Sequence, residues 1–75
     1  MKQDVKYQKK LKAFGLKVRE IREAKGWTLE ETEAHGWSNW QHLQKIESGK
    51  NVTLATLFKV CDVFDIKVSE LLKSL

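Results

Sequence analysis

Apolar residues recur at intervals of three or four along most of this chain, the spacing that places side chains on one face of an α-helix. The first such stripe consists of Tyr7, Leu11, Phe14, Val18 and Ile21. No segment shows the sustained two-residue alternation of a half-buried strand. The pattern therefore predicts an all-α fold.

Polar and glycine residues indicate where the first helix begins and ends. Asp4 is a candidate N-terminal cap, and Lys25-Gly26 ends the helix because Gly26 can adopt the left-handed conformation of a helix C-terminus. Gly15 lies inside the helix, where it costs about 1 kcal/mol relative to alanine. We therefore expect the first two turns to fray.

Capping signals delimit a second and a third helix. Thr28-Leu29-Glu30-Glu31 forms a capping box, in which the Thr28 hydroxyl and the Glu31 carboxylate each accept a backbone N–H of the other residue. That helix ends at His35-Gly36, and the next begins at Ser38 or Asn39 and ends at Ser48-Gly49. Two short helices joined by a short turn with a glycine match a helix-turn-helix unit.

The remaining apolar residues predict two more helices, which brings the total to five. The fourth starts near Thr53 and carries an inward stripe of Leu54, Leu57, Val60, Cys61 and Phe64. The fifth is short, from about Val68 to Leu72, with Leu71 and Leu72 turned inward. A chain of 75 residues forms one small domain.

The third helix combines an apolar edge with an edge of hydrogen-bond donors. Leu43 and Ile46 lie on one side, and Gln41, Gln44 and Lys45 share the opposite side. Amide and ammonium groups are suited to reading base edges in the major groove of DNA. A solvated helix face is the alternative interpretation.

The net charge of +4 is distributed unevenly along the chain. Residues 1–25 hold nine of the fourteen Lys and Arg residues, against three acidic residues. Such a basic segment is typical of a protein that binds a polyanion, although lysines can equally serve to solvate a helix face.

Several other classes of protein find little support. His35, His42 and Cys61 do not have the spacing of a zinc site, so we expect no metal and no cofactor. Ser38, Ser48, His42 and Asp62 are not arranged as an oriented catalytic triad, and we expect no enzyme. Apolar runs stay well below the roughly 18 residues of a membrane span. Because the N-terminus also lacks the apolar core of a signal peptide, we expect a cytoplasmic protein.

Three segments, in this order and at this spacing, resemble the lambda-repressor-like, xenobiotic-response-element-type helix-turn-helix family: residues 18–29, 43–50 and 53–66. The resemblance covers about residues 14–72. It implies a compact five-helix domain over residues 11–75, with the second and third helices as the DNA-binding unit. Residues 1–10 would be a basic N-terminal arm or an extension of the first helix.

The resemblance also implies roles for individual residues. Base contacts would come from Trp40, Gln41, Gln44 and Lys45. Phosphate contacts would come from Thr28, Leu29, Asn39, Lys50 and Asn51. Arg22 and Glu47 match a pair that ties the first helix to the third in many relatives.

The chain departs from the family pattern at three places. Thr32-Glu33 replaces the usual Leu-Ala of the second helix, Val52 replaces a proline, and Trp40 is unusual at a base-reading position. Glu33 leaves the crossing of the second helix open, and Ala34, Gly36 and Trp37 would supply the missing packing. Trp27 and Trp37 are expected to cover the small core.

These features together predict a bacterial or phage regulator that binds double-stranded DNA in a sequence-specific manner, as a repressor and a homodimer, without a small-molecule effector. The dimer surface would include Phe58, Val63, Leu72 and Leu75, with Leu16 as another candidate contact. The alternative is a protein-interaction module that kept the fold but lost DNA reading. The acidic residues Glu30, Glu31 and Glu33, together with the tryptophans, motivate that alternative.

Overall fold

The computed structural model describes residues 5–73 and 75, so the candidate cap Asp4 lies outside the described residues. Its elements follow in the order α1 (Val5–Ala24), η1 (Glu30–His35), α2 (Trp40–Glu47), α3 (Leu54–Phe64) and α4 (Val68–Leu71). All are helical, and no strand occurs in this part of the chain. The predicted all-α, five-helix fold is confirmed.

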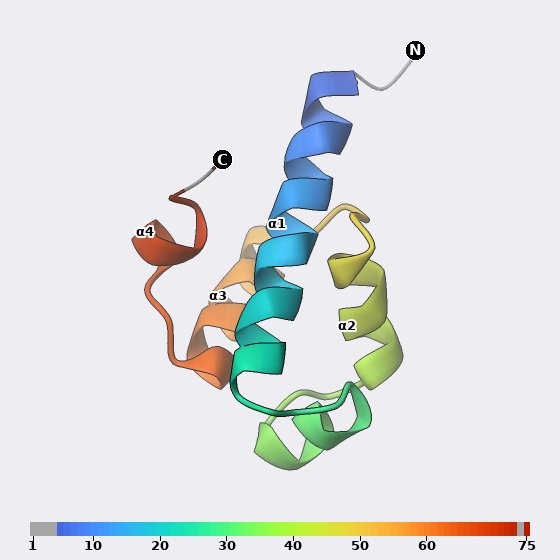
Figure 1. The fold of residues 1–75 in the computed structure, drawn as a ribbon, viewed down its shortest axis with the longest axis vertical. Helices are drawn as coiled ribbons and strands as arrows, with labels where there is room; N and C mark the ends of the chain where they lie inside the picture. The colour runs from blue at the N-terminus through green and yellow to red at the C-terminus, as the bar shows by residue number, and fades with distance from the viewer. Residues whose placement is uncertain (1–4, 74) are drawn as a thin grey trace.

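Helix α1 is the central element of the arrangement. In Figure 1 it runs through the middle of the molecule, with α2 on one side and α3 and α4 on the other, and its N-terminal turns extend beyond the rest of the fold. A single core lies among these helices and contains Phe14, Val18, Trp37, Leu43, Ile46, Leu57, Val60, Cys61, Phe64 and Leu71.

Three residues predicted to be in the core are instead exposed: Tyr7 at 54%, Leu54 at 68% and Leu72 at 37%. Each lies at or beyond the end of a packed element. Tyr7 is on the N-terminal turns of α1, Leu54 is the first residue of α3, and Leu72 is the C-terminal cap of α4. The predictions for these three residues were wrong because helical spacing identifies a face, not how far along the helix a partner covers it.

Gly15 permits a close approach between two helices. It is buried in α1, and a Cβ atom built on it would lie 2.4 Å from the carbonyl oxygen of Ile46 and 2.6 Å from that of Glu47. The backbone of α1 therefore touches the C-terminal end of α2, and no side chain fits between them. Helix α1 is continuous from Val5 through Gly15.

The second element is a short 3₁₀-helix, and the sequence predicted where it begins and where it ends. The amide of Thr28 donates to Glu31 Oε1 at 2.7 Å, and the amide of Glu31 donates to Thr28 Oγ1 at 3.1 Å. These two bonds are the predicted capping box. Gly36 ends the element with a φ of 110°. Thr32, fully buried, hydrogen-bonds through its hydroxyl to the carbonyl of Leu29 three residues earlier. This bond reinforces the i to i+3 geometry of a 3₁₀ turn.

Side-chain caps also begin the next two helices where they were predicted. Asn39 Oδ1 accepts the amides of Gln41 and His42 at the start of α2. Thr53 Oγ1 accepts the amide of Thr56 at the start of α3. These caps satisfy backbone donors that have no partner inside the helix. The direction in which α2 leaves the turn is therefore fixed locally.

The tryptophans of the two turns pack as the sequence predicted. Trp37 is 2% exposed and belongs to the core. Trp27 is partly buried, with its ring stacked on His35 at 3.8 Å and tilted against Phe64 at 5.6 Å. Among the described residues, none of the helices combines the length and the apolar character that a membrane crossing requires.

Candidate nucleic-acid interface

Helix α2 has an inner face in the core and an outer face in solvent. Leu43 and Ile46 are fully buried, whereas Gln41, Gln44 and Lys45 are exposed. The amide and ammonium groups therefore project from a helix whose position is fixed by its apolar side. Trp40 is half-buried at the edge of the same helix.

Two side chains, one amide and one carboxylate, accept backbone N–H groups in the first turn of α2. Asn39 Oδ1 accepts the amide of Gln41 at 2.8 Å, and Glu33 Oε2 accepts the amide of Trp40 at 2.9 Å. Glu33 is exposed, and the neighbouring Thr32 takes the buried position. The unusual Thr32-Glu33 pair therefore leaves no charge in the helix crossing and places a carboxylate at the positive end of α2.

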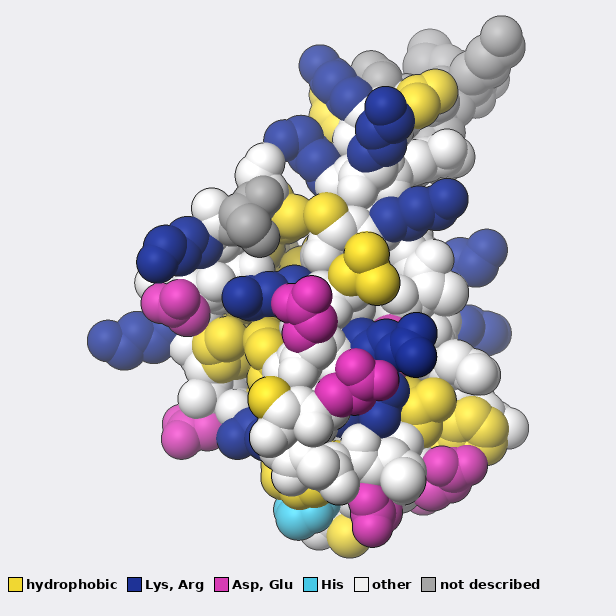
Figure 2. All heavy atoms as spheres, in the orientation of Figure 1, with side chains coloured by type: hydrophobic (Ala, Val, Ile, Leu, Met, Phe, Trp, Pro, Cys, Tyr) yellow, Lys and Arg dark blue, Asp and Glu magenta, His cyan; other side chains and the backbone are white. Residues whose placement is uncertain are grey.

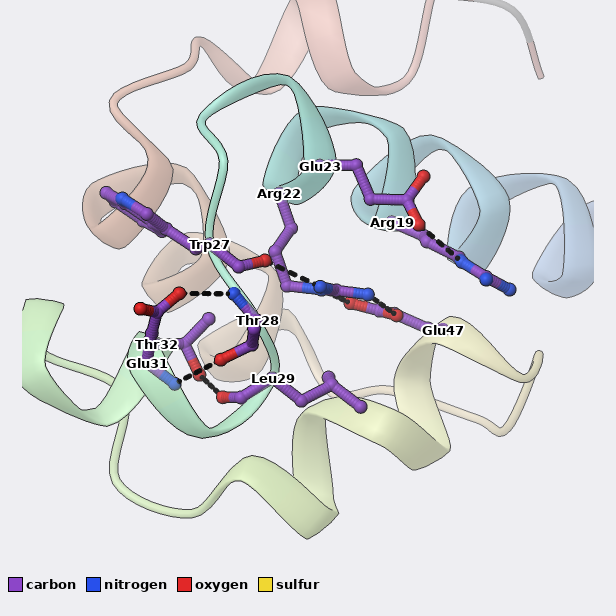
Figure 3. Close-up of polar contacts among 9 residues, drawn as sticks. All are labelled: Arg19, Arg22, Glu23, Trp27, Thr28, Leu29, Glu31, Thr32 and Glu47. Atoms are coloured by element: carbon purple, nitrogen blue, oxygen red, sulfur yellow. Dashed lines mark hydrogen bonds and ion pairs between the residues drawn. The ribbon is translucent and has the colours of Figure 1, made fainter.

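Arg22 and Glu47 form a buried ion pair between α1 and the end of α2, as Figure 3 shows. Arg22 Nε lies 2.7 Å from Glu47 Oε2, and Nη2 lies 3.1 Å from Oε1. Arg22 Nη1 also donates to the carbonyl of Trp27 at 2.7 Å. The two side chains are only 9% and 7% exposed.

The hydrogen bond to Glu47 raises the pKa of Arg22, against the opposing effect of burial. The guanidinium is thus charged and joins three segments: α1, the turn before η1, and α2. The ion pair therefore fixes the position of α2 from its inner side, and it is not itself part of the exposed outer face.

The residues expected to contact phosphate differ in which of their hydrogen-bond donors are free. The Thr28 amide is already bonded to Glu31, and the Lys50 amide donates to the carbonyl of Lys45. Asn39 uses its side-chain oxygen for capping. Within the described residues, the amides of Leu29 and Asn51 have no hydrogen-bond partner. The structure therefore leaves two free amides and the Lys50 side chain at these positions.

Basic side chains are concentrated around α1. In the view of Figure 2 basic side chains surround its N-terminal half and also lie along both margins of the molecule, while carboxylates lie in the lower half. The ion pairs among the described residues are Arg19–Glu23, Arg22–Glu47 and Glu70–Lys73. Lys45 and Lys50 are outside these pairs, so their charges are available to a ligand.

Two of the three acidic residues that suggested a protein-interaction module have structural roles. Glu31 closes the capping box, and Glu33 holds the start of α2. The Trp27 and Trp37 rings are packed, so they form no exposed aromatic patch. The sequence did not predict the role of Glu33, and its only signal was the departure from Leu-Ala.

The described residues contain no group of three or more His, Cys, Asp or Glu side chains that could hold a metal ion. Cys61 is buried in α3, and burial raises the pKa of its thiol. It is placed as a small apolar core residue.

The comparisons with known proteins agree with this geometry. The model of the helix-turn-helix family matches residues 18–71. The chain belongs to that family, in its lambda-repressor-like, xenobiotic-response-element-type form. It is therefore a DNA-binding helix-turn-helix domain. No curated protein and no solved structure matches the chain.

Proposed function

We propose that this protein binds double-stranded DNA in a sequence-specific manner by placing α2 in the major groove, and that it represses transcription by occupying its site. The observation that carries the proposal is the exposed row of Gln41, Gln44 and Lys45 on a helix whose opposite face is fully buried. A major groove admits one helix with this distribution of donors.

Each exposed side chain of α2 suits a particular base edge. The Gln41 and Gln44 amides can bond adenine in a bidentate manner, and the Lys45 ammonium can reach the acceptors of guanine. One good bidentate contact discriminates by about 1–3 kcal/mol. Trp40, at the edge of the helix, would contact a thymine methyl group or a sugar.

Phosphate contacts would fix the register of α2 without reading sequence. The free amides of Leu29 and Asn51 and the side chain of Lys50 support this role. Thr28 and Asn39 would contribute through their remaining donors. The Arg22–Glu47 pair would hold α2 at a constant angle to these groups.

We also propose that the protein binds as a symmetric dimer, because a single small module offers few contacts. Two copies would read half-sites about 34 Å apart. Exposed apolar side chains support this step: Phe58 on α3, and Leu72 and Leu75 beside a groove of about 420 Å³. Leu16 on α1 is the other candidate contact.

Selection from a random duplex library, repeated at rising salt, tests the proposal. We expect enrichment of one sequence motif and a steep linear fall of log K with log salt, since phosphate neutralisation releases counterions. The double substitution Gln41→Ala with Lys45→Ala should abolish the sequence preference. Lys67→Ala removes one charge next to α4 and serves as the control.

A response that is flat in both sequence and salt would refute DNA binding as the function. If the Gln41/Lys45 variant kept its preference, α2 would not be the reading helix. Retained capture of a protein partner by that variant, together with no DNA binding by the wild type, would favour the interaction module instead.

A further inference from the structure

A polar hollow lies between α1 and the loop that follows α2. It measures about 350 Å³, and its wall includes Gln8 and Lys12 from α1 and Ser48, Gly49, Lys50 and Asn51 from the loop. Gln8 and Lys12 precede residues 18–71, the part of the chain that matches the family. The α1 side of the hollow is therefore formed by the N-terminal half of this helix, which begins at Val5.

Two glycines hold the walls of this hollow together. Gly15 lets the α1 backbone touch the end of α2. Gly49 has a φ of 99°, and a Cβ atom on it would lie 2.7 Å from Lys12 Cγ and 3.2 Å from Lys12 Cα. The loop backbone thus packs directly on α1 at Lys12. This contact holds the backbone of Lys12 next to the loop that carries Lys50.

The charge of the hollow is positive and uncompensated. Lys12 and Lys50 are exposed and take part in none of the ion pairs found among the described residues. Glu47, the acidic residue next to the loop in sequence, is already paired with Arg22. Gln8 and Asn51 add neutral polar side chains, so the hollow offers donors to an anion.

We propose that this hollow binds a backbone phosphate of duplex DNA, held between Lys12 and Lys50, outside the base pairs that α2 reads. The proposal rests on the proposed function, because it places a second contact on the same duplex. Lys50 belongs to the loop that would contact phosphate in any case. Lys12 and Gln8 come from the part of α1 that precedes the family match, and they add a second wall to the site.

The test compares Lys12→Gln with Lys10→Gln on the duplex that the wild-type protein selects. Both substitutions remove one lysine charge from the same turns of α1. Lys10 points to the other side of the helix, where its Nζ donates to the carbonyl of Leu75 at 3.2 Å. Long-range charge effects are therefore matched, and only the hollow differs. Urea unfolding of both variants checks that the fold is retained.

We expect the salt slope of Lys12→Gln to be shallower than that of the wild type by about 0.9, the value for one phosphate. The ratio of its Kd to the wild-type Kd should accordingly shrink about 3.5-fold between 50 and 200 mM salt. Lys10→Gln should keep the wild-type slope.

A scan of duplexes with a single uncharged methylphosphonate then locates the contact. At one position the methylphosphonate should weaken binding by the wild type and Lys10→Gln more than binding by Lys12→Gln, which keeps only the Lys50 contact to that phosphate. Equal slopes and equal scans for the two variants would overturn the phosphate site while leaving the proposed function intact. If the wild type selected no duplex at all, both proposals would fail together.

Discussion

Gly15 shows how one residue sets the distance between two helices. Its missing side chain lets α1 approach the carbonyls of Ile46 and Glu47. In an exposed helix, replacing glycine by alanine stabilises by about 1 kcal/mol. Here we expect the opposite sign: Gly15→Ala should lower the free energy of unfolding by about 1–3 kcal/mol, because the added methyl group overpacks a backbone contact.

Urea denaturation of this variant measures the effect. Ala13→Gly makes the reverse change two residues away, at an exposed position of α1, and should cost about 1 kcal/mol from helix propensity alone. Both variants should therefore be less stable than the wild type. A rise in the stability of Gly15→Ala would show that the two helices can separate at little cost.

The Arg22–Glu47 pair makes a second prediction at the residue scale. Glu47→Gln keeps the shape of the side chain but leaves the buried guanidinium without a counter-charge. Removing one partner of a buried pair costs about 3–5 kcal/mol. Glu23→Gln breaks the exposed Arg19–Glu23 pair, whose side chains are more than half exposed, and should change stability little.

Thermal and urea unfolding of both variants provide the comparison. If Glu47→Gln were as stable as Glu23→Gln, the buried pair would not be what fixes α2 to α1. Its effect on DNA affinity should then also be small.

At the scale of the element, the start of α2 carries a carboxylate where DNA would approach. Glu33→Gln retains an oxygen that can accept the Trp40 amide but removes the charge. We expect little change in stability and a higher affinity for duplex DNA, with a larger gain at low salt because salt screens the repulsion. Glu70→Gln on α4 is the control, since it removes the same charge beside Lys73.

Fluorescence anisotropy with the selected duplex measures both variants. A weaker affinity for Glu33→Gln would contradict this expectation. It would indicate that the carboxylate itself accepts a hydrogen bond from a base, as glutamate does from the amino group of cytosine.

Helix α3 carries the buried thiol of Cys61, which makes stability depend on pH. Burial raises the pKa of this thiol in the folded state above its value in the unfolded chain. The contribution to stability is therefore complete below about pH 8.5, the usual thiol pKa, and is lost as pH rises through the folded-state value.

Urea unfolding from pH 7 to 10 should show this loss in the wild type. The comparison is with Cys61→Ala, which has no thiol and whose smaller side chain costs a similar amount at every pH. The stability difference between the two proteins should narrow as pH rises. Parallel curves would mean that the thiol ionises equally well in both states.

For the whole molecule, local signals predicted the elements more reliably than their packing. The Thr28–Glu31 capping box, Asn39 and Thr53 each mark a helix start, since a cap is decided by residues three apart. The family resemblance then placed these elements in one fold. The capping signals and the family motifs both depend on residues that are close together in the sequence.

Features that depend on distant segments were harder to predict. Nothing near Gly15 in sequence indicates that Ile46 and Glu47 lie against it. Leu54 and Leu72 follow the helical stripe yet extend past the elements that could cover them. Glu33 finds its partner, the Trp40 amide, only once the turn has folded. The base and phosphate contacts proposed for α2 and its surroundings stay predictions until DNA is bound.

The proposed dimer leads to a prediction for the whole molecule. In a symmetric dimer each substitution is present in both subunits, so its effect on the interface counts twice. Fully burying an exposed leucine contributes about 1.5–3 kcal/mol. Leu72 is only 37% exposed in the monomer, so a dimer built on the α4 surface would gain about a third of that value per copy. Leu72→Gln should therefore weaken this dimer by about five- to fortyfold in Kd. Leu16→Gln makes the same change at the other candidate contact on α1 and should leave that dimer unchanged.

Sedimentation equilibrium over a range of protein concentrations measures both variants. If only Leu16→Gln dissociated the dimer, the interface would lie on the exposed face of α1 instead. A wild type that stays monomeric at every concentration would rule out a dimer in free solution. Cooperative binding to paired half-sites about 34 Å apart would then have to arise on the DNA, and a single half-site would bind the monomer more weakly than the paired site does.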